Sequence, residues 1–213
     1  MAEVEDGADY QPVFRYRIES GAPSEARDIV YEEDRSAELT APVRRVAYFW
    51  RVTGQDGTER YLWAAFDSPS AKAAELGVPV KSRGAAFQQP VTGLEILSNI
   101  PGVRSGRFAH GNLEFQDCNY GPENAAKVAG ADDARFDAGD RMDPSISPGY
   151  GTMQLHNRDV NQTVFAYNNW RAGNGCDLGF GNAPEGQPDW TFSGAGKNYR
   201  EAELTVLVLP ARP

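Results

Sequence analysis

Residues 44–66 read RRVAYFWRVTGQDGTERYLWAAF, and this stretch decides the class of the fold. Its two halves, 44–53 and 59–66, are rich in the β-branched and aromatic residues that favour strands. The four residues GQDG near its centre are typical of a tight turn between antiparallel strands. The stretch therefore predicts a β-hairpin.

Similar strand-forming runs recur along the whole chain of 213 residues. They predict further strands at 10–18, 85–89, 91–100, 112–115, 149–156, 162–170, 177–181 and 201–209. The 22 glycines and 14 prolines suit short strands that are joined by tight turns. We therefore expect an all-β fold, namely a two-sheet antiparallel sandwich of the jelly-roll type.

One segment has a helical composition instead. Ser68 is a candidate N-cap, Pro69 suits the first position of a helix, and the alanines of PSAKAAEL favour helix formation. Gly77 and Pro79 would end the helix. The sequence predicts one short helix over residues 69–76.

The length fits one continuous domain, since all-β domains of about 200 residues are common. No linker rich in proline, serine or charge divides the chain. We expect a flexible N-terminal tail over residues 1–9 and a single β-sandwich domain over residues 10–213.

The chain is acidic, with a formal net charge of -9. This charge repels phosphate backbones, which makes nucleic acid a poor candidate partner. No run approaches the roughly 18 to 20 apolar residues of a membrane-spanning helix, and residues 1–9 lack the basic and apolar regions of a signal peptide. We expect no membrane span, and either a cytoplasmic location or a mature form without its signal.

The segment from Gly149 to Gly194 combines strand motifs with glycines, side-chain amides and aromatic rings. Amides and rings of this kind hydrogen-bond to and stack on neutral polar ligands. The competing interpretation of its tryptophans, Trp170 and Trp190, is that both belong to the core of a sandwich. The candidate ligand-binding residues, with the loop framework behind them, are Glu114, Asn119, Tyr120, Asn124, Gln154, His156, Asn168, Trp170, Asp177, Asn182, Asp189 and Trp190.

The irregular stretch 119–148 is a candidate calcium site. It carries a dense group of aspartates, namely Asp132, Asp133, Asp137, Asp140 and Asp143. Calcium binds such oxygen ligands, but their spacing is not that of an EF-hand loop. The alternative is a solvated loop whose aspartates cap turns. The two cysteines, Cys118 and Cys176, can form one disulfide or remain independent thiols.

Signals for catalysis are weak. The Gly-x-Ser-x-Gly motif is absent, and His156 is the best candidate base, although no nucleophile accompanies it. A structural imidazole is the competing interpretation. Two carboxylates could also act as a glycosidase pair, chosen from Glu114, Asp117, Asp177 and Asp189.

Several motifs in a fixed order resemble a known domain. They are RVAYFWRV (45–52), LGVPVKSRGAAFQQPV (76–91), HGNLEFQDCNYGPENAAKVAGA (110–131), GYGTMQLHN (149–157), QTVFAYNNW (162–170), DLGFGN (177–182) and PDWTFSG (188–194). This succession, over residues 10–209, resembles an accessory β domain of large secreted proteins of planctomycetes and related bacteria. Those proteins are often labelled sialate O-acetylesterase or carbohydrate-active.

The resemblance implies a lectin-like or carbohydrate-associated sandwich that is usually extracellular. Esterases of that name carry their nucleophile in a separate α/β domain, and this chain has neither its glycine-serine signature nor its terminal Asp-x-x-His. We therefore expect a non-catalytic module that binds a neutral or weakly charged saccharide. The alternatives are a carbohydrate-active hydrolase or esterase that uses a carboxylate pair or His156, and a structural or adhesive subunit of a surface or appendage.

Overall fold

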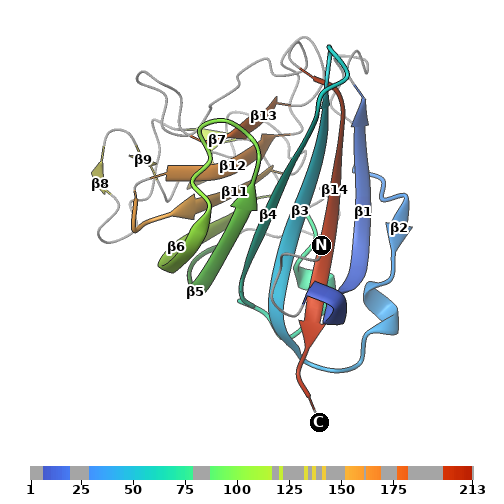
Figure 1. Ribbon diagram of the computed structural model, residues 1–213. Helices are drawn as coiled ribbons and strands as arrows, with labels where there is room; N and C mark the ends of the chain where they lie inside the picture. The colour runs from blue at the N-terminus through green and yellow to red at the C-terminus, as the bar shows by residue number, and fades with distance from the viewer. Residues whose placement is uncertain are drawn as a thin grey trace.

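The computed structural model describes residues 7–19, 29–78, 87–116, 120–121, 132–133, 136–137, 141–142, 152–160, 162–168, 177–181 and 199–212. Within these residues, ten strands form one antiparallel sheet in the order β13-β12-β11-β6-β5-β4-β3-β14-β1-β2 (Figure 1). The all-β class predicted from the sequence is confirmed.

The strands of this sheet are β1 (Gln11–Glu19), β2 (Glu33–Asp34), β3 (Val43–Gly54), β4 (Glu59–Asp67), β5 (Phe87–Ser98), β6 (Gly106–Gln116), β11 (Thr152–Asn157), β12 (Gln162–Asn168), β13 (Asp177–Phe180) and β14 (Tyr199–Pro210). The described residues also include two short strand pairs, β7 (Tyr120–Gly121) with β10 (Arg141–Met142) and β8 (Asp132–Asp133) with β9 (Phe136–Asp137). The predicted strands at 85–89 and 91–100 are one continuous strand, β5.

The hairpin predicted from residues 44–66 is confirmed as β3 and β4. Its turn closes when Gly57 N–H donates to the carbonyl of Gly54 and Thr58 N–H donates to the Asp56 side chain. Gly57 has a φ of 82°, a conformation that residues with a Cβ adopt only at a cost. The glycine is therefore required by the turn.

The C-terminal strand β14 lies between β1 and β3, the strands that begin the chain. Val206 is opposite Phe14 on one side and Tyr48 on the other. Its alternating apolar residues Leu204, Val206 and Val208 are buried in the main core. The strand predicted at 201–209 is confirmed as β14, and the first and last strands of the chain pair in one sheet.

The sheet curls so that its two halves pack against each other (Figure 1). Trp50 of β3 contacts Phe165 of β12 with ring centroids 5.9 Å apart, although four strands lie between β3 and β12 in the sheet. Across the same face, the Tyr167 hydroxyl donates to the Tyr16 hydroxyl at 3.0 Å. The main core therefore lies on the inner face of the curl, and we call the opposite face the outer face.

The predicted helix over residues 69–76 is wrong. The described part of the chain has there only a 3-10 turn, η3 (Ala73–Glu75), and no α-helix. The carbonyl of Ala71 accepts a hydrogen bond from Val43 N–H of the sheet, and Leu76 is fully buried in the core. These tertiary contacts outweigh the helix propensity of a segment too short to stabilise a helix alone.

Other 3-10 turns are η1 (Gly7–Asp9), within the segment expected to be a tail, and η2 (Ser36–Glu38). None of the helical turns that the structure describes is long and apolar enough to cross a membrane.

Candidate functional site

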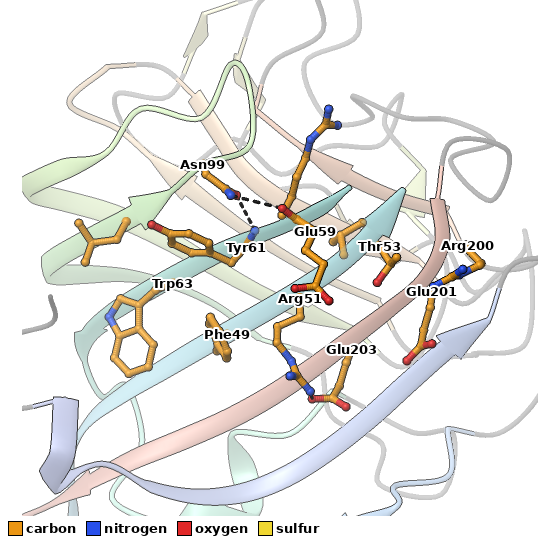
Figure 2. Close-up of a pocket in the computed structure, with 13 residues that line it drawn as sticks. Phe49, Arg51, Thr53, Glu59, Tyr61, Trp63, Asn99, Arg200, Glu201 and Glu203 are labelled. Atoms are coloured by element: carbon orange, nitrogen blue, oxygen red, sulfur yellow. Dashed lines mark hydrogen bonds and ion pairs between the residues drawn. The ribbon is translucent and has the colours of Figure 1, made fainter. Parts of the chain in front are cut away.

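A groove of about 730 Å³ crosses the outer face over β3, β4, β5 and β14 (Figure 2). Strand alternation explains its composition, because every second residue of these strands points away from the core. Phe49 lies opposite Trp63, which in turn lies opposite Leu97. In the next row Arg51 lies opposite both Tyr61 and Glu203. The groove thus has an aromatic row beside a charged row.

Three aromatic rings line the groove, one fixed and two accessible. Trp63 is only 2% exposed and packs edge-on against Tyr10, with ring centroids 5.1 Å apart. Phe49 packs on Trp63 at a centroid distance of 6.2 Å. Phe49 and Tyr61 remain partly exposed, and Figure 2 shows their rings beside Trp63 at one end of the groove. Trp63 therefore supports a surface that Phe49 and Tyr61 present to solvent.

The charged row is a chain of ion pairs. Arg51 Nη2 donates to Glu203 Oε1 at 2.6 Å, and Arg17 Nη2 donates to Glu203 Oε2 at 3.2 Å. Burial of Glu203 acts to raise its pKa, but the hydrogen bond and charge of Arg51, joined by Arg17, outweigh burial and hold the pKa below its ordinary value. Glu203 thus stays ionised and fixes Arg51, whose side chain is 61% exposed.

Asn99 holds the end of β4 where β5 no longer pairs with it. The side-chain oxygen Oδ1 of Asn99 accepts from the backbone N–H of Tyr61 at 2.7 Å. The backbone N–H of Asn99 donates to the Tyr61 carbonyl at 3.3 Å. The side-chain nitrogen Nδ2 of Asn99 also donates to the carbonyl of Glu59 at 3.4 Å (Figure 2). These bonds fix the backbone of Tyr61 and therefore the face of the sheet on which its side chain lies.

Three of the residues predicted from the sequence come together elsewhere. Glu114 of β6 lies opposite Gln154 of β11, and Asn112 lies opposite His156. Asn112 Nδ2 donates to Glu114 Oε1 at 2.7 Å, and His156 Nε2 bonds to Gln154 Oε1 at 2.7 Å. His156 Nδ1 is 3.9 Å from Glu114 Oε1. We call these four residues the polar cluster, and all four are fully buried.

Burial decides the charge of His156. Desolvation lowers the pKa of its imidazole to about 3, because a buried imidazolium loses its hydration. The ring is therefore neutral at neutral pH, and since the Gln154 oxygen can only accept, Nε2 carries the hydrogen. Neither His156 nor Glu114 faces solvent, so the polar cluster is part of the packed protein and not an open cleft.

No protein-family model, curated protein or solved structure matches this chain. The resemblance to a carbohydrate-associated domain stays a prediction.

The other predicted residues lie outside these two groups. For Tyr120 in β7, and for Asn168 and Asp177, which are opposite each other in β12 and β13, the backbone alone is described. The predicted residues outside the described part of the chain are Asn119, Asn124, Trp170, Asn182, Asp189 and Trp190, together with Asp117, Cys118 and Cys176.

Some of the predicted calcium ligands have a described backbone, and the others lie outside the described residues. Asp132 lies opposite Asp137 in the pair of β8 and β9, with Asp133 beside it, and only their backbones are described. Asp140 and Asp143 lie outside the described residues. Among the side chains that the structure describes, no three His, Cys, Asp or Glu residues gather into a metal site.

The sequence interpretation missed the groove. Phe49, Arg51 and Thr53 in β3, and Glu59, Tyr61 and Trp63 in β4, are spaced two residues apart and line the groove. The sequences of β3 and β4 are so rich in aromatic residues that both faces of each strand look apolar. The available signal was an arginine or glutamate two residues from an aromatic residue in each strand, which places rings on a face that also carries charge.

Proposed function

We propose that the chain is a saccharide-binding module whose ligand lies in the outer-face groove. The observation that supports this most directly is the pair of partly exposed rings, Phe49 and Tyr61, beside fixed hydrogen-bonding groups of Arg51 and Asn99. A sugar ring has an apolar face that stacks on aromatic rings and a rim of hydroxyls that bind planar polar groups. The groove offers both within one surface.

The charges of the groove fit a neutral or weakly charged ligand. Its described lining contains the arginines 51, 60 and 200 and the glutamates 59, 201 and 203, which balance one another. Because the whole chain carries a net charge of -9, this balance is a local property of the groove. A highly charged polyanion would gain little there, whereas a neutral sugar would find both hydrogen-bond donors and acceptors.

The proposal assigns binding without bond cleavage. A glycosidase acid must hold a proton near neutral pH, which requires a raised pKa. Glu203 has the opposite property, since Arg51 and Arg17 keep it ionised. Glu114 and His156 are sealed in the polar cluster. An ionised Glu203 and a buried Glu114 and His156 therefore favour a binding module over a hydrolase or esterase that uses these three residues.

The remaining expectations from the sequence belong to this proposal. The resemblance to a carbohydrate-associated domain supports saccharide binding and an extracellular location. The ring contacts between β3 and β12 support packing of two layers, as in a sandwich. The jelly-roll strand order and calcium binding stay predictions.

Affinity gel electrophoresis against a panel of neutral polysaccharides tests the proposal. At least one polymer should retard the wild-type protein, and Tyr61→Ala should weaken that binding about tenfold, as expected for loss of about 1.4 kcal/mol of stacking. Tyr61→Phe keeps the ring and should bind nearly as well as wild type. Val30→Ala, which trims an exposed apolar side chain outside the groove lining, is the control for surface hydrophobicity.

Two results would refute the proposal. One is the absence of retardation across the panel. The other is unchanged binding by Tyr61→Ala when circular dichroism shows that this variant is folded. Since Tyr61 is partly exposed, the melting temperature of the Tyr61→Ala variant should stay close to that of wild type.

A further inference from the structure

Trp63 brings a buried hydrogen-bond donor to the wall of the groove. The residue lines the groove, and its indole nitrogen Nε1 is buried without an acceptor among the described residues. Most buried donors in folded proteins have a partner, because an unpaired donor has lost its hydrogen bonds to water and gained none. An unpaired donor beside a groove is therefore a candidate for contact with a ligand.

The unpaired nitrogen lies on the side of the indole that faces β5. Figure 2 shows it at the edge of the ring that points away from Phe49. Phe49 is opposite Trp63 in β3, whereas Leu97 is opposite Trp63 in β5, on the other side of β4. Leu97 packs against the same apolar cluster as Trp63 and also lines the groove. Leu97 is therefore the groove-lining side chain next to the indole N–H in β5.

Leu97 is held less firmly than the ring that it adjoins. Its side chain is partly exposed, whereas Trp63 is buried and fixed by its edge-on contact with Tyr10 at 5.1 Å. A leucine side chain at a surface changes rotamer within picoseconds to nanoseconds and needs no movement of the backbone. A change of rotamer at Leu97 would thus uncover the nitrogen while the indole stays in place.

A buried donor gives a ligand more than an exposed donor does. Arg51 also lines the groove, and its largely exposed side chain must release water before it binds a ligand oxygen. The Trp63 N–H makes no such exchange, because it is buried. On the side of the protein, a hydrogen bond from Trp63 to a ligand is therefore a gain, less the small cost of moving Leu97.

We propose that Trp63 is a concealed donor of the groove, and that a saccharide oxygen accepts from its Nε1 once the Leu97 side chain turns aside. The ligand then reaches from Tyr61 to the β5 side of Trp63. Trp63 has two roles in this arrangement, since its ring supports Phe49 and its N–H binds the ligand. The saccharide contact rests on the proposed function, whereas the concealment of the N–H by Leu97 does not.

The indole N–H resonances of the isotope-labelled protein test the inference by NMR. In the free protein, Leu97→Ala should shift the Trp63 resonance and speed its hydrogen exchange, because water then reaches the nitrogen. In wild type, an oligosaccharide of the polymer that retards the protein should shift the same resonance downfield as the hydrogen bond forms. Trp50 is the internal control, because its Nε1 is also buried without an acceptor among the described residues but belongs to the main core. Its resonance should not move in either experiment.

Replacement of Trp63 by benzothienylalanine tests the contribution of the N–H to binding. This amino acid has sulfur in place of the N–H, so it removes the donor and keeps the shape of the ring. It should weaken binding of the oligosaccharide about tenfold, the effect of one lost hydrogen bond. The melting temperature should stay close to that of wild type, because the free protein loses no hydrogen bond. The same replacement at Trp50 is the matched control and should leave binding unchanged.

Two results would overturn the inference. An unchanged Trp63 resonance in Leu97→Ala would show that Leu97 does not conceal the donor. Equal affinity of wild type and the protein with benzothienylalanine at residue 63 would remove the ligand contact, and if Tyr61→Ala still weakens binding, the groove stands. Absence of retardation by every polysaccharide would instead refute the proposed function and the saccharide contact together, and the Leu97→Ala result would still decide the concealment.

Discussion

Acidification should destabilise the fold through His156, the imidazole of the polar cluster. The pKa of His156 is about 3 in the folded protein, because the ring is fully buried, whereas its ordinary value is 6.5. The unfolded chain therefore binds a proton more readily than the folded one at every pH between these two values. The free energy of unfolding then falls as the pH falls below 6.5, and the loss is complete near the folded pKa.

The size of this effect follows from the difference in pKa. Each pKa unit corresponds to about 1.4 kcal/mol, so the full loss on acidification is about 5 kcal/mol. Between about pH 7 and about pH 5 the same relation gives a loss of about 2 kcal/mol. A domain whose free energy of unfolding is about 5 to 15 kcal/mol would lose a large part of its stability over this range.

Urea denaturation of wild type and His156→Gln, followed by tryptophan fluorescence at several pH values, measures the effect. The amide of glutamine does not titrate and can still donate a hydrogen bond to Gln154. His156→Gln costs stability at neutral pH through imperfect packing, but this offset is independent of pH. The stability difference between the two proteins should therefore shrink by about 2 kcal/mol from about pH 7 to about pH 5. A constant difference over this range would refute the desolvated, neutral imidazole.

Other parts of the fold give three further predictions. Leu76→Ala should cost about 3 kcal/mol in urea denaturation because Leu76 is fully buried, and a cost below about 1 kcal/mol would place residue 76 outside the core. Gly57→Ala should cost about 1 to 2 kcal/mol because φ is 82°, and an unchanged midpoint would contradict the turn. Tyr16→Phe and Tyr167→Phe should each cost about 1 kcal/mol, and their costs should not add, since one hydrogen bond joins them; additive costs would argue against this bond across the curl.

The strands could be predicted from the sequence because their signals are local. The β-branched and aromatic composition of 44–66 and the apolar run at 201–209 indicate strands without knowledge of any partner, and β3, β4 and β14 form there. The helix at 69–76 failed for the opposite reason. Its outcome depends on contacts of Ala71 and Leu76 with distant parts of the chain, which local propensity does not contain.

The sites depend on register between distant strands, which the sequence does not show. The polar residues Glu114, Gln154 and His156 were selected for their chemistry, and the structure brings them together, but as a buried cluster. Their burial follows from how β6 and β11 pair over about 40 residues of separation. The groove needs β14 beside β3, which places Glu203 against Arg51 across a separation of 152 residues.

The most direct test of the saccharide-binding groove is NMR chemical-shift mapping with an oligosaccharide of the polymer that retards the protein in the affinity gel. We predict that the shifted resonances centre on Phe49, Arg51 and Tyr61 at the outer face of β3 and β4. Shifts that centre instead on Asn168 and Asp177 in β12 and β13, with the groove unaffected, would contradict the account.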